Sequence, residues 1–354
     1  MRSLAVAVVV AVAAVGCAGG DARTAPTATT GAGARQGGLQ ALARPHRLRM
    51  GTAVRANALA ADARYGPTIA AQYGMVTPEN DLKFAPTEPE RGRFDFTAAD
   101  AVVRFAERNH VAVRGHTLVW HRQLPAWLTE GRFDRAELLA VMRAHIAAVV
   151  GRYRGRIAQW DVVNEAMGDD GALRDNLWLR GIGPDYIAEA FRAARAADPE
   201  ARLFLNEYGI ESPGPKADAT VALVARLRAD GVPVDGVGFQ AHTVPGSPTG
   251  AALARQLRRV ARLGLETAVT EADVRLELPP TPAALADQAR SYRDLLTACL
   301  EEWSCHTFVT WGFSDAWSWI SKTFPGSGAA LPFDDHYRPK PAQRAMAAAL
   351  RAPP

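Results

Sequence analysis

The chain has 354 residues, of which 48% are hydrophobic and 22% are charged. This is the composition of an ordinary globular protein with enough apolar material for a large core. The formal charge of +4 is spread along the chain without a run of five or six like charges, so charge argues against a nucleic-acid-binding protein.

The first 17 residues predict a signal peptide. Arg2 supplies a short positive region, and 4–15 is an apolar stretch of about a dozen residues, too short to span a bilayer. Ala14-Val15-Gly16-Cys17 then resembles a bacterial lipobox, with Ala14 at the position where Leu is usual. We expect an exported protein, either tethered to a membrane through a lipidated Cys17 or released after ordinary signal cleavage nearby.

A flexible linker is predicted over residues 18–40, because Ala, Gly and Thr dominate there and large apolar side chains are few. Apolar periodicity then continues from Leu42 to Leu350 with no second linker of this kind. The sequence therefore predicts one catalytic domain over residues 41–351, and we expect a monomer.

Short apolar segments alternate with amphipathic ones throughout this domain. The eight predicted strands are Arg49–Val54, Met75–Thr77, Ala112–Val119, Ala158–Val163, Arg202–Leu205, Gly236–Gln240, Glu266–Thr270 and Thr307–Trp311. The segments between them have helical spacing. Helix starts are indicated by capping boxes at Thr97 with Asp100 and at Asp134 with Glu137, and by Thr281 before a first-turn proline.

Eight strands alternating with helices predict an α/β fold, a single closed (β/α)8 TIM barrel. The alternative is an open doubly wound sheet. That fold usually carries a Gly-rich phosphate turn after its first strand, and residues 50–54 contain no such turn.

Polar and aromatic residues stand at the carboxyl ends of seven consecutive predicted strands, the end at which barrels carry their active sites. In chain order they are Glu79, Asn80 and Lys83; His116, Trp120 and His121; Asn164 and Glu165; Asn206, Glu207 and Tyr208; Gln240 and His242; Glu271 and Asp273; Trp311 and Trp319. Aromatic plates, amides and carboxylates in one mouth suit a sugar ligand.

Cleavage of a glycosidic bond needs two carboxyl groups, one protonated and one ionised. Glu165 and Glu271 are the natural pair, because each closes an apolar strand and their strands lie across the barrel from one another. A separation of about 5–5.5 Å between the carboxyl groups would give retention, and about 6.5–9.5 Å inversion. Taken singly, either residue could equally be a solvated or ion-paired Glu.

Five ordered motifs resemble glycoside hydrolase family 10, the (β/α)8 xylanases, over roughly residues 42–350. They are Arg114-Gly115-His116-Thr117-Leu118-Val119-Trp120-His121 with Gln123-Leu124-Pro125, Trp160-Asp161-Val162-Val163-Asn164-Glu165, Gly238-Phe239-Gln240-Ala241-His242, Thr270-Glu271-Ala272-Asp273 and Trp311-Gly312-Phe313-Ser314-Asp315. The chain departs from the family pattern at Phe84, Glu207 and Ala272, which leaves its subsite preferences open.

The resemblance implies a role for each matching residue. Glu165 resembles the general acid/base, Glu271 the nucleophile, Asn164 the group that binds the sugar 2-hydroxyl, and His242 the partner of Glu271, with Gln240 close by. The other implied sugar contacts are Glu79, Asn80, Lys83, His116 and Trp120 on the glycone side, Tyr208 on the aglycone side, and Trp311 and Trp319 as cleft walls.

Cys299 and Cys305 remain once Cys17 is set aside. A small even number in an exported chain favours one disulfide between them. A metal site is the less favoured alternative, since His306 is the only other common ligand adjacent to them.

The function implied is endo-acting, retaining hydrolysis of β-1,4-xylan, with xylan and xylo-oligosaccharides as ligands and with neither metal nor organic cofactor. Three alternatives stay open. One is β-1,4-glucanase or cellulase action at the same site, and another is a surface protein that binds xylan without cleaving it. The third is a metal-dependent barrel hydrolase, disfavoured because the first strand lacks a His-x-His pair.

Overall fold

The computed structural model describes residues 37–353. The predicted signal peptide, Cys17 and most of the predicted linker lie outside the described residues. Among the helices of residues 37–353, none is both long and apolar enough to cross a membrane.

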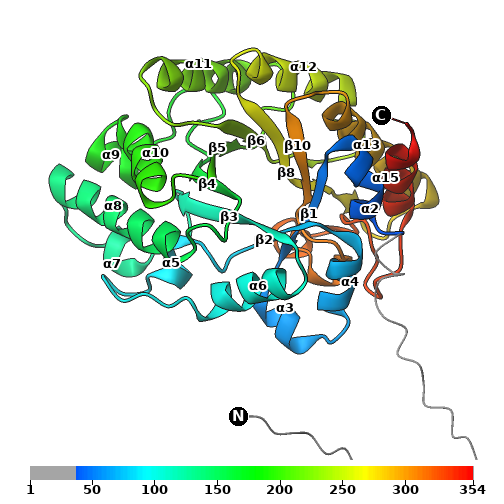
Figure 1. Cartoon of the computed structure of the whole chain (residues 1–354). Coiled ribbons are helices and arrows are strands. Elements are labelled where there is room, and N and C mark those ends of the chain that lie inside the picture. Colours follow the sequence, from blue (N-terminus) through cyan, green and yellow to red (C-terminus); the bar gives the residue numbers. More distant parts are fainter. Residues whose placement is uncertain (1–36, 354) are drawn as a thin grey trace, which may run out of the picture.

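Eight parallel strands form a closed barrel, because β10 pairs with both β1 and β8 (Figure 1). The barrel strands are β1 (Arg49–Val54), β2 (Met75–Pro78), β3 (Ala112–Val119), β4 (Gln159–Asn164), β5 (Arg202–Glu207), β6 (Gly236–Phe239), β8 (Glu266–Val274) and β10 (Cys305–Thr310). The predicted TIM barrel is confirmed, and closure excludes the open doubly wound sheet. All eight predicted strands are present, with ends shifted by a few residues.

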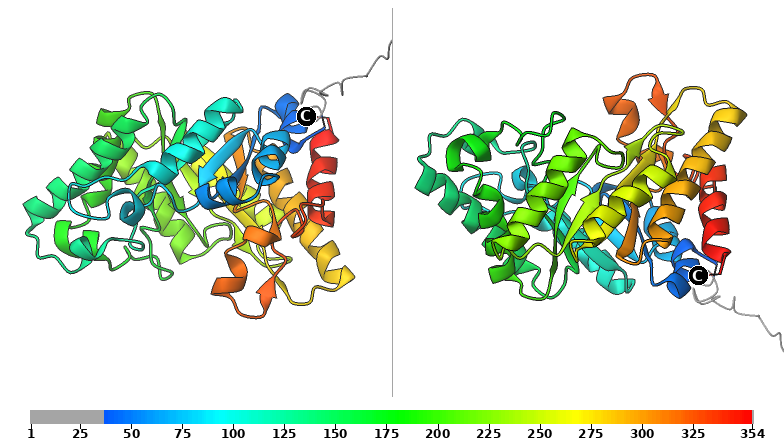
Figure 2. Two further views of the ribbon diagram at one scale, coloured as in Figure 1. Left: turned by 90° about the horizontal axis from the view of Figure 1, so that it is seen from below. Right: turned by 90° about the horizontal axis from the view of Figure 1, so that it is seen from above.

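Helices surround the barrel and connect successive strands (Figures 1 and 2). They are α2 (Leu39–Ala43), α3 (Ala56–Ala61), α4 (Tyr65–Gln72), α5 (Phe84–Thr87), α6 (Thr97–Arg108), α7 (Ala126–Thr129), α8 (Arg135–Arg152), α9 (Leu177–Ile182), α10 (Tyr186–Ala197), α11 (Pro215–Ala229), α12 (Gly250–Ala261), α13 (Pro282–Leu300), α14 (Ile320–Thr323) and α15 (Pro341–Arg351), with 3-10 turns at η1 (Arg44–His46) and η2 (Asp315–Trp317).

The predicted linker extended too far into the domain. Helix α2 begins at Leu39, whose side chain is fully buried and whose backbone N–H donates to Gln72 Oε1 at 3.3 Å. Gln40 Oε1 in turn accepts from the backbone N–H of Met50 at the start of β1, at 2.9 Å. These contacts make residues 39 and 40 part of the fold.

Two of the three predicted helix starts are confirmed. Asp134 and Glu137 form a capping box at the start of α8, with bonds of 2.8 and 3.0 Å between each side chain and the other residue's backbone N–H. Thr281 Oγ1 caps α13 by accepting from the N–H of Ala284 at 3.1 Å.

The predicted capping box at Thr97 and Asp100 is wrong. Helix α6 begins at Thr97, so this residue is the first helical position, and the N-cap is Phe96 without a side-chain bond. The Asp100 carboxylate turns instead toward the neighbouring helix α8. It accepts there from Arg152 and from the hydroxyl of Tyr153 at 2.9 Å. A charge-assisted bond outcompetes a neutral backbone cap.

A small lobe follows β10 on the mouth side of the barrel. It has its own apolar cluster of Ile320, Ala330 and Leu331, against which Trp319 and Phe324 pack. Two short strands outside the barrel, β9 (Leu276–Glu277) and β11 (Ser327–Gly328), pair at its edge, and a further short strand β7 (His242–Thr243) extends the sheet beside β8. Figure 2 shows the lobe (orange) at the opposite end of the barrel from α2 (dark blue).

The predicted disulfide is present between Cys299 at the end of α13 and Cys305 at the start of β10, with the two Cα atoms 5.3 Å apart. It closes the turn at the end of the barrel opposite the mouth, so it supports the fold rather than the site.

Candidate active site

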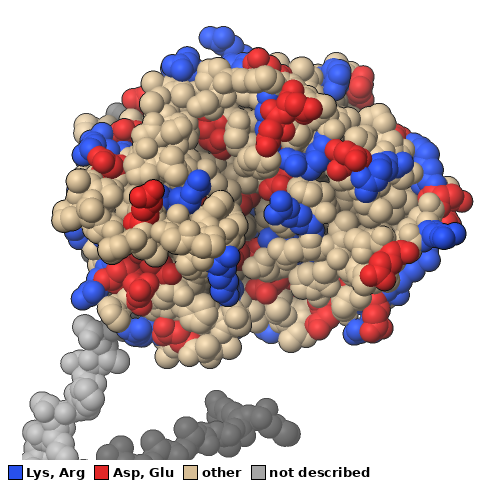
Figure 3. Space-filling view, turned by 180° about the vertical axis from the view of Figure 1, so that it is seen from behind, with Lys and Arg blue, Asp and Glu red and all other residues tan. Residues whose placement is uncertain are grey.

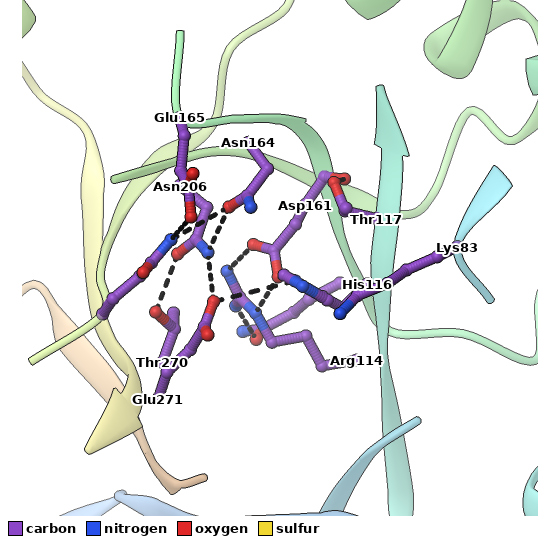
Figure 4. A network of polar contacts seen from close by, with 12 residues as sticks. Lys83, Arg114, His116, Thr117, Asp161, Asn164, Glu165, Asn206, Thr270 and Glu271 are labelled. Carbon is purple, nitrogen blue, oxygen red and sulfur yellow. Dashed lines mark hydrogen bonds and ion pairs between the residues drawn. The ribbon is translucent and has the colours of Figure 1, made fainter. Parts of the chain in front are cut away.

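The carboxyl ends of β4, β5 and β8 meet at one side chain, Asn206. Its Nδ2 donates to Asn164 Oδ1 at 2.8 Å and to Glu271 Oε1 at 2.7 Å, while its Oδ1 accepts from Thr270 Oγ1 at 2.7 Å (Figure 4). Gly238 of β6 makes room for this amide, since a Cβ there would lie 2.2 Å from Asn206 Oδ1.

Gln240 extends the network to the second carboxyl group. Its Nε2 lies 3.2 Å from both Asn164 Oδ1 and Glu165 Oε1. Two amide donors therefore occupy the Asn164 oxygen, and among the described residues no acceptor takes a hydrogen bond from its Nδ2, which remains available for a ligand hydroxyl. Glu165 and Glu271 thus converge as predicted, linked by three amide side chains.

Glu271 is buried with histidines on both sides. His242 Nε2 lies 3.1 Å from Glu271 Oε2, and His242 Nδ1 lies 2.9 Å from Asp273 Oδ2. Burial alone would raise the pKa of Glu271, but His116 and His242 lower it below its ordinary value. Burial would likewise lower the pKa of His242, yet Asp273 and Glu271 raise it well above its ordinary value. The pair is an ionised carboxylate facing an imidazolium.

A buried ion pair lies behind His116 and was not identified as part of the site from the sequence. His116 Nδ1 is 3.0 Å from Asp161 Oδ2 and 3.8 Å from Glu271 Oε1. Arg114 is fully buried; its Nε donates to the same Asp161 oxygen at 3.1 Å, and its Nη2 pairs with the other. Burial would raise the pKa of Asp161, but Arg114 and His116 lower it. The sequence did carry a signal for this pair, because Arg114 and Asp161 are charged residues within otherwise apolar strands.

Glu165 lies at the edge of this network. Its side chain is 13% exposed against 5% for Glu271, so it can reach solvent and a leaving group. His121 Nδ1 lies 3.8 Å from Glu165 Oε2, and burial lowers the pKa of His121 to about 4. His121 is therefore a neutral neighbour of Glu165.

The predicted glycone-side residues form a second connected group. Asn80 Oδ1 accepts from Lys83 Nζ at 3.0 Å and from Gln123 Nε2 at 3.1 Å. Glu79 binds Arg55 through two bonds of 2.6 and 2.7 Å. Arg55 and Gln123 were not predicted as site residues. Arg55 neutralises the buried Glu79, and Gln123 fixes the orientation of the Asn80 amide.

Three predicted tryptophans border the site. The ring of Trp120 lies 4.7 Å from Lys83 Nζ. Trp311 meets His116 edge to face at a centroid distance of 5.0 Å. Trp319, from the small lobe, donates through Nε1 to Asp273 Oδ2 at 2.8 Å.

On the opposite flank, Tyr208 follows β5 and its hydroxyl accepts from Arg174 Nη2 at 2.8 Å. Arg174 was not predicted. Its signal in the sequence is weak, because it lies in a loop outside every strand-end motif.

The assembled site offers one ionised and one partly exposed carboxyl group, amides aimed between them and aromatic rings around them. This chemistry suits cleavage of a sugar chain. Within residues 37–353, no three His, Cys, Asp or Glu side chains are grouped as a metal site. Charged side chains on the face shown in Figure 3 are mixed in sign, and both signs reach into its central hollow.

Similarity to known proteins identifies the family. The sequence profile described as Glycosyl hydrolase family 10 matches residues 38–349. The chain belongs to glycosyl hydrolase family 10. It is 42% identical over 280 residues to endo-1,4-beta-xylanase C of Phanerodontia chrysosporium, covering 79% of this chain and 70% of that protein.

Solved family 10 structures superpose on most of this chain. Native xylanase 10B from Thermotoga maritima is 40% identical with a TM-score of 0.86, covering 88% of this chain and 98% of that one. Xylanase 10B from Thermotoga petrophila RKU-1 in complex with xylobiose is 39% identical with a TM-score of 0.87, covering 88% and 97% respectively.

Proposed function

We propose that this chain is a retaining endo-1,4-β-xylanase in which Glu271 is the nucleophile and Glu165 the general acid/base. The observation that carries the assignment of roles is the ionised Glu271 between His116 and His242. Three amides, Asn206, Asn164 and Gln240, join it to the more exposed Glu165. Membership of family 10 and relatives named endo-1,4-beta-xylanase support the reaction and its substrate.

In the first step the Glu271 carboxylate attacks the anomeric carbon of the xylosyl unit, and Glu165 transfers its proton to the glycosidic oxygen. The bond to the leaving xylan chain breaks, and a covalent xylosyl-enzyme ester remains on Glu271. Asn164 Nδ2 donates to the 2-hydroxyl, a contact that strengthens as positive charge develops on the ring.

In the second step Glu165, now a carboxylate, accepts a proton from water as that water attacks the anomeric carbon. The ester bond breaks, and Glu271 returns to the carboxylate that His242 and His116 stabilise. Two inversions at the same carbon retain the anomeric configuration.

The experiment pairs two variants with two substrates. Glu271→Ala should abolish cleavage of both xylohexaose and an activated aryl β-xylobioside. Glu165→Ala should lower kcat/KM on xylohexaose by about 10²–10⁴-fold, the contribution of a general acid, while sparing the aryl substrate, whose leaving group needs little protonation.

Proton NMR of xylohexaose digestion reports the anomer formed first, and cellohexaose in a parallel reaction tests the glucanase alternative. An α-xylose end as the first product, or equal losses on both substrates in Glu165→Ala, would refute the assigned roles. Faster cleavage of cellohexaose than of xylohexaose would replace the xylanase by a β-1,4-glucanase.

We also propose that the enzyme acts outside the cytoplasm as a monomer, either anchored through a lipidated Cys17 or released after signal cleavage. The Cys299–Cys305 disulfide supports export, since such bonds persist in oxidising compartments. Lipidation of Cys17 and the monomeric state stay predictions.

A further inference from the structure

Arg174, in the loop between β4 and α9, connects two parts of the site that strand geometry alone does not join. Its Nε donates to the backbone carbonyl of Glu165 at 3.0 Å. Its Nη2 donates to the carbonyl of Met167 at 2.9 Å and to the phenolic oxygen of Tyr208 at 2.8 Å. One guanidinium thus holds the backbone of the acid/base residue and the edge of an aromatic ring.

The backbone of Glu165 has a conformation that needs support. Its φ is +57°, in the left-handed region that a residue with a long side chain rarely adopts. Its N–H donates to the carbonyl of Asn206 at 2.9 Å, and its own carbonyl accepts from Arg174. The N–H and the carbonyl of Glu165 are therefore both held by hydrogen bonds, and together they fix the direction in which its side chain leaves the backbone.

One face of the Tyr208 ring packs against a buried lysine. Lys216, at the start of α11, is 4% exposed and places Nζ 3.1 Å from the ring centroid. The same Nζ lies 3.2 Å from Glu207 Oε2 and 3.6 Å from Asp169 Oδ1. The Tyr208 hydroxyl donates to Asp169 Oδ1 at 2.7 Å. With one face covered by the ammonium, the other face is left for a pyranose ring.

Glu207 links Lys216 to the loop that follows Glu165. It is fully buried, and its Oε1 accepts from the N–H of Met167 at 2.9 Å, so Met167 is held by Glu207 through its N–H and by Arg174 through its carbonyl. The loop after Glu165 and the ring of Tyr208 therefore rest on one shared set of charged side chains.

We propose that Arg174 is a positioning residue that couples sugar binding on Tyr208 to the placement of Glu165, with Lys216 holding the ring. The inference rests on the proposed function and on the leaving-group-side role that the family resemblance implies for Tyr208. A xylosyl unit stacked on Tyr208 presses on a ring whose edge is bonded to Arg174, which holds the peptide of Glu165. Binding there and proton delivery to the leaving oxygen are thereby linked.

The test compares xylopentaose with 2,4-dinitrophenyl β-xylobioside, which has no sugar on the leaving-group side and a leaving group that needs no proton. The quantity measured is kcat/KM, because it reports the steps up to cleavage of the glycosidic bond. The variants are Arg174→Met, Tyr208→Phe and the double variant. Arg180→Met is the control, since Arg180 is an exposed arginine paired with Asp175 at 2.8 Å.

We expect Arg174→Met to lower kcat/KM on xylopentaose by about 30- to 100-fold, as misplacement of a general acid does, and on the aryl substrate by less than about threefold. Tyr208→Phe keeps the ring and loses the bonds that the hydroxyl makes with Arg174 and with Asp169. It should lower kcat/KM on xylopentaose by about three- to tenfold. If the residues act through one another, the double variant is no slower than Arg174→Met.

Equal losses on both substrates in Arg174→Met would overturn the proposal, as would a double variant whose loss is the product of the two single losses. If Arg174→Met does not fold, Tyr208→Phe decides alone, and unchanged kcat/KM on xylopentaose in that variant refutes the coupling. A wild-type enzyme that leaves xylopentaose intact would instead refute the proposed function.

Discussion

The buried ion pair of Arg114 and Asp161 gives a stability prediction. Asp161→Asn keeps the shape of the side chain and removes its charge, leaving the fully buried Arg114 without a counterion. Breaking one side of a buried pair costs about 3–5 kcal/mol of folding free energy. Because the unfolding entropy of a domain of this length is about 0.7 kcal/mol/K, the melting temperature should fall by about 4–7 °C.

Urea unfolding followed by tryptophan fluorescence measures this loss, and Asp185→Asn is the matched control. Asp185 pairs with Arg135 at the surface, with side chains about half exposed, so its loss should cost less than about 1 kcal/mol. Since the pKa of Asp161 is lowered in the folded state, its contribution is present at neutral pH and is lost only as pH falls below about 4. A loss below about 1 kcal/mol at pH 7 would refute the reasoning.

Two further predictions concern the nucleophile and the disulfide. Asp273→Asn removes a group that raises the pKa of His242, so the pKa of His242 should fall and that of Glu271 should rise, and the acid limb of the kcat/KM profile for xylohexaose should move to higher pH. An acid limb at unchanged pH would contradict this coupling. The double variant Cys299→Ser/Cys305→Ser should lose about 2 kcal/mol of unfolding free energy in urea, because the loop it opens is short. Dithiothreitol should destabilise the wild type by a similar amount and leave the variant unchanged.

The barrel and its mouth were predictable because both follow from regular patterns. Strand ends carry function in this fold, so a polar residue that closes an apolar strand is visible in the sequence. Glu165, Glu271 and His242 were found by this rule. The Thr97 and Asp100 capping box failed because a local pattern could not anticipate the cation that α8 presents to Asp100.

The residues that the sequence did not reveal are those that act through others. Arg55, Arg114 and Arg174 each neutralise or orient a side chain brought close by the fold, and these side-chain partners are 24 to 47 residues away. No spacing rule links such pairs, because the barrel closure sets the distance between them. Only the three-dimensional structure shows which group each arginine contacts.

Arg114 and Asp161, which the strand-end rule missed, help to balance the charge around Glu271. Glu271 is stabilised by two imidazoles, and each imidazole is backed by an aspartate, Asp273 behind His242 and Asp161 behind His116. Asp161 is in turn neutralised by Arg114. The two imidazoles lower the pKa of Glu271 and keep it ionised, while the aspartates behind them and Arg114 balance the charge of the buried site. The side chains behind the two histidines therefore help to set the charge around Glu271, although a strand-end rule cannot find Asp161 or Arg114.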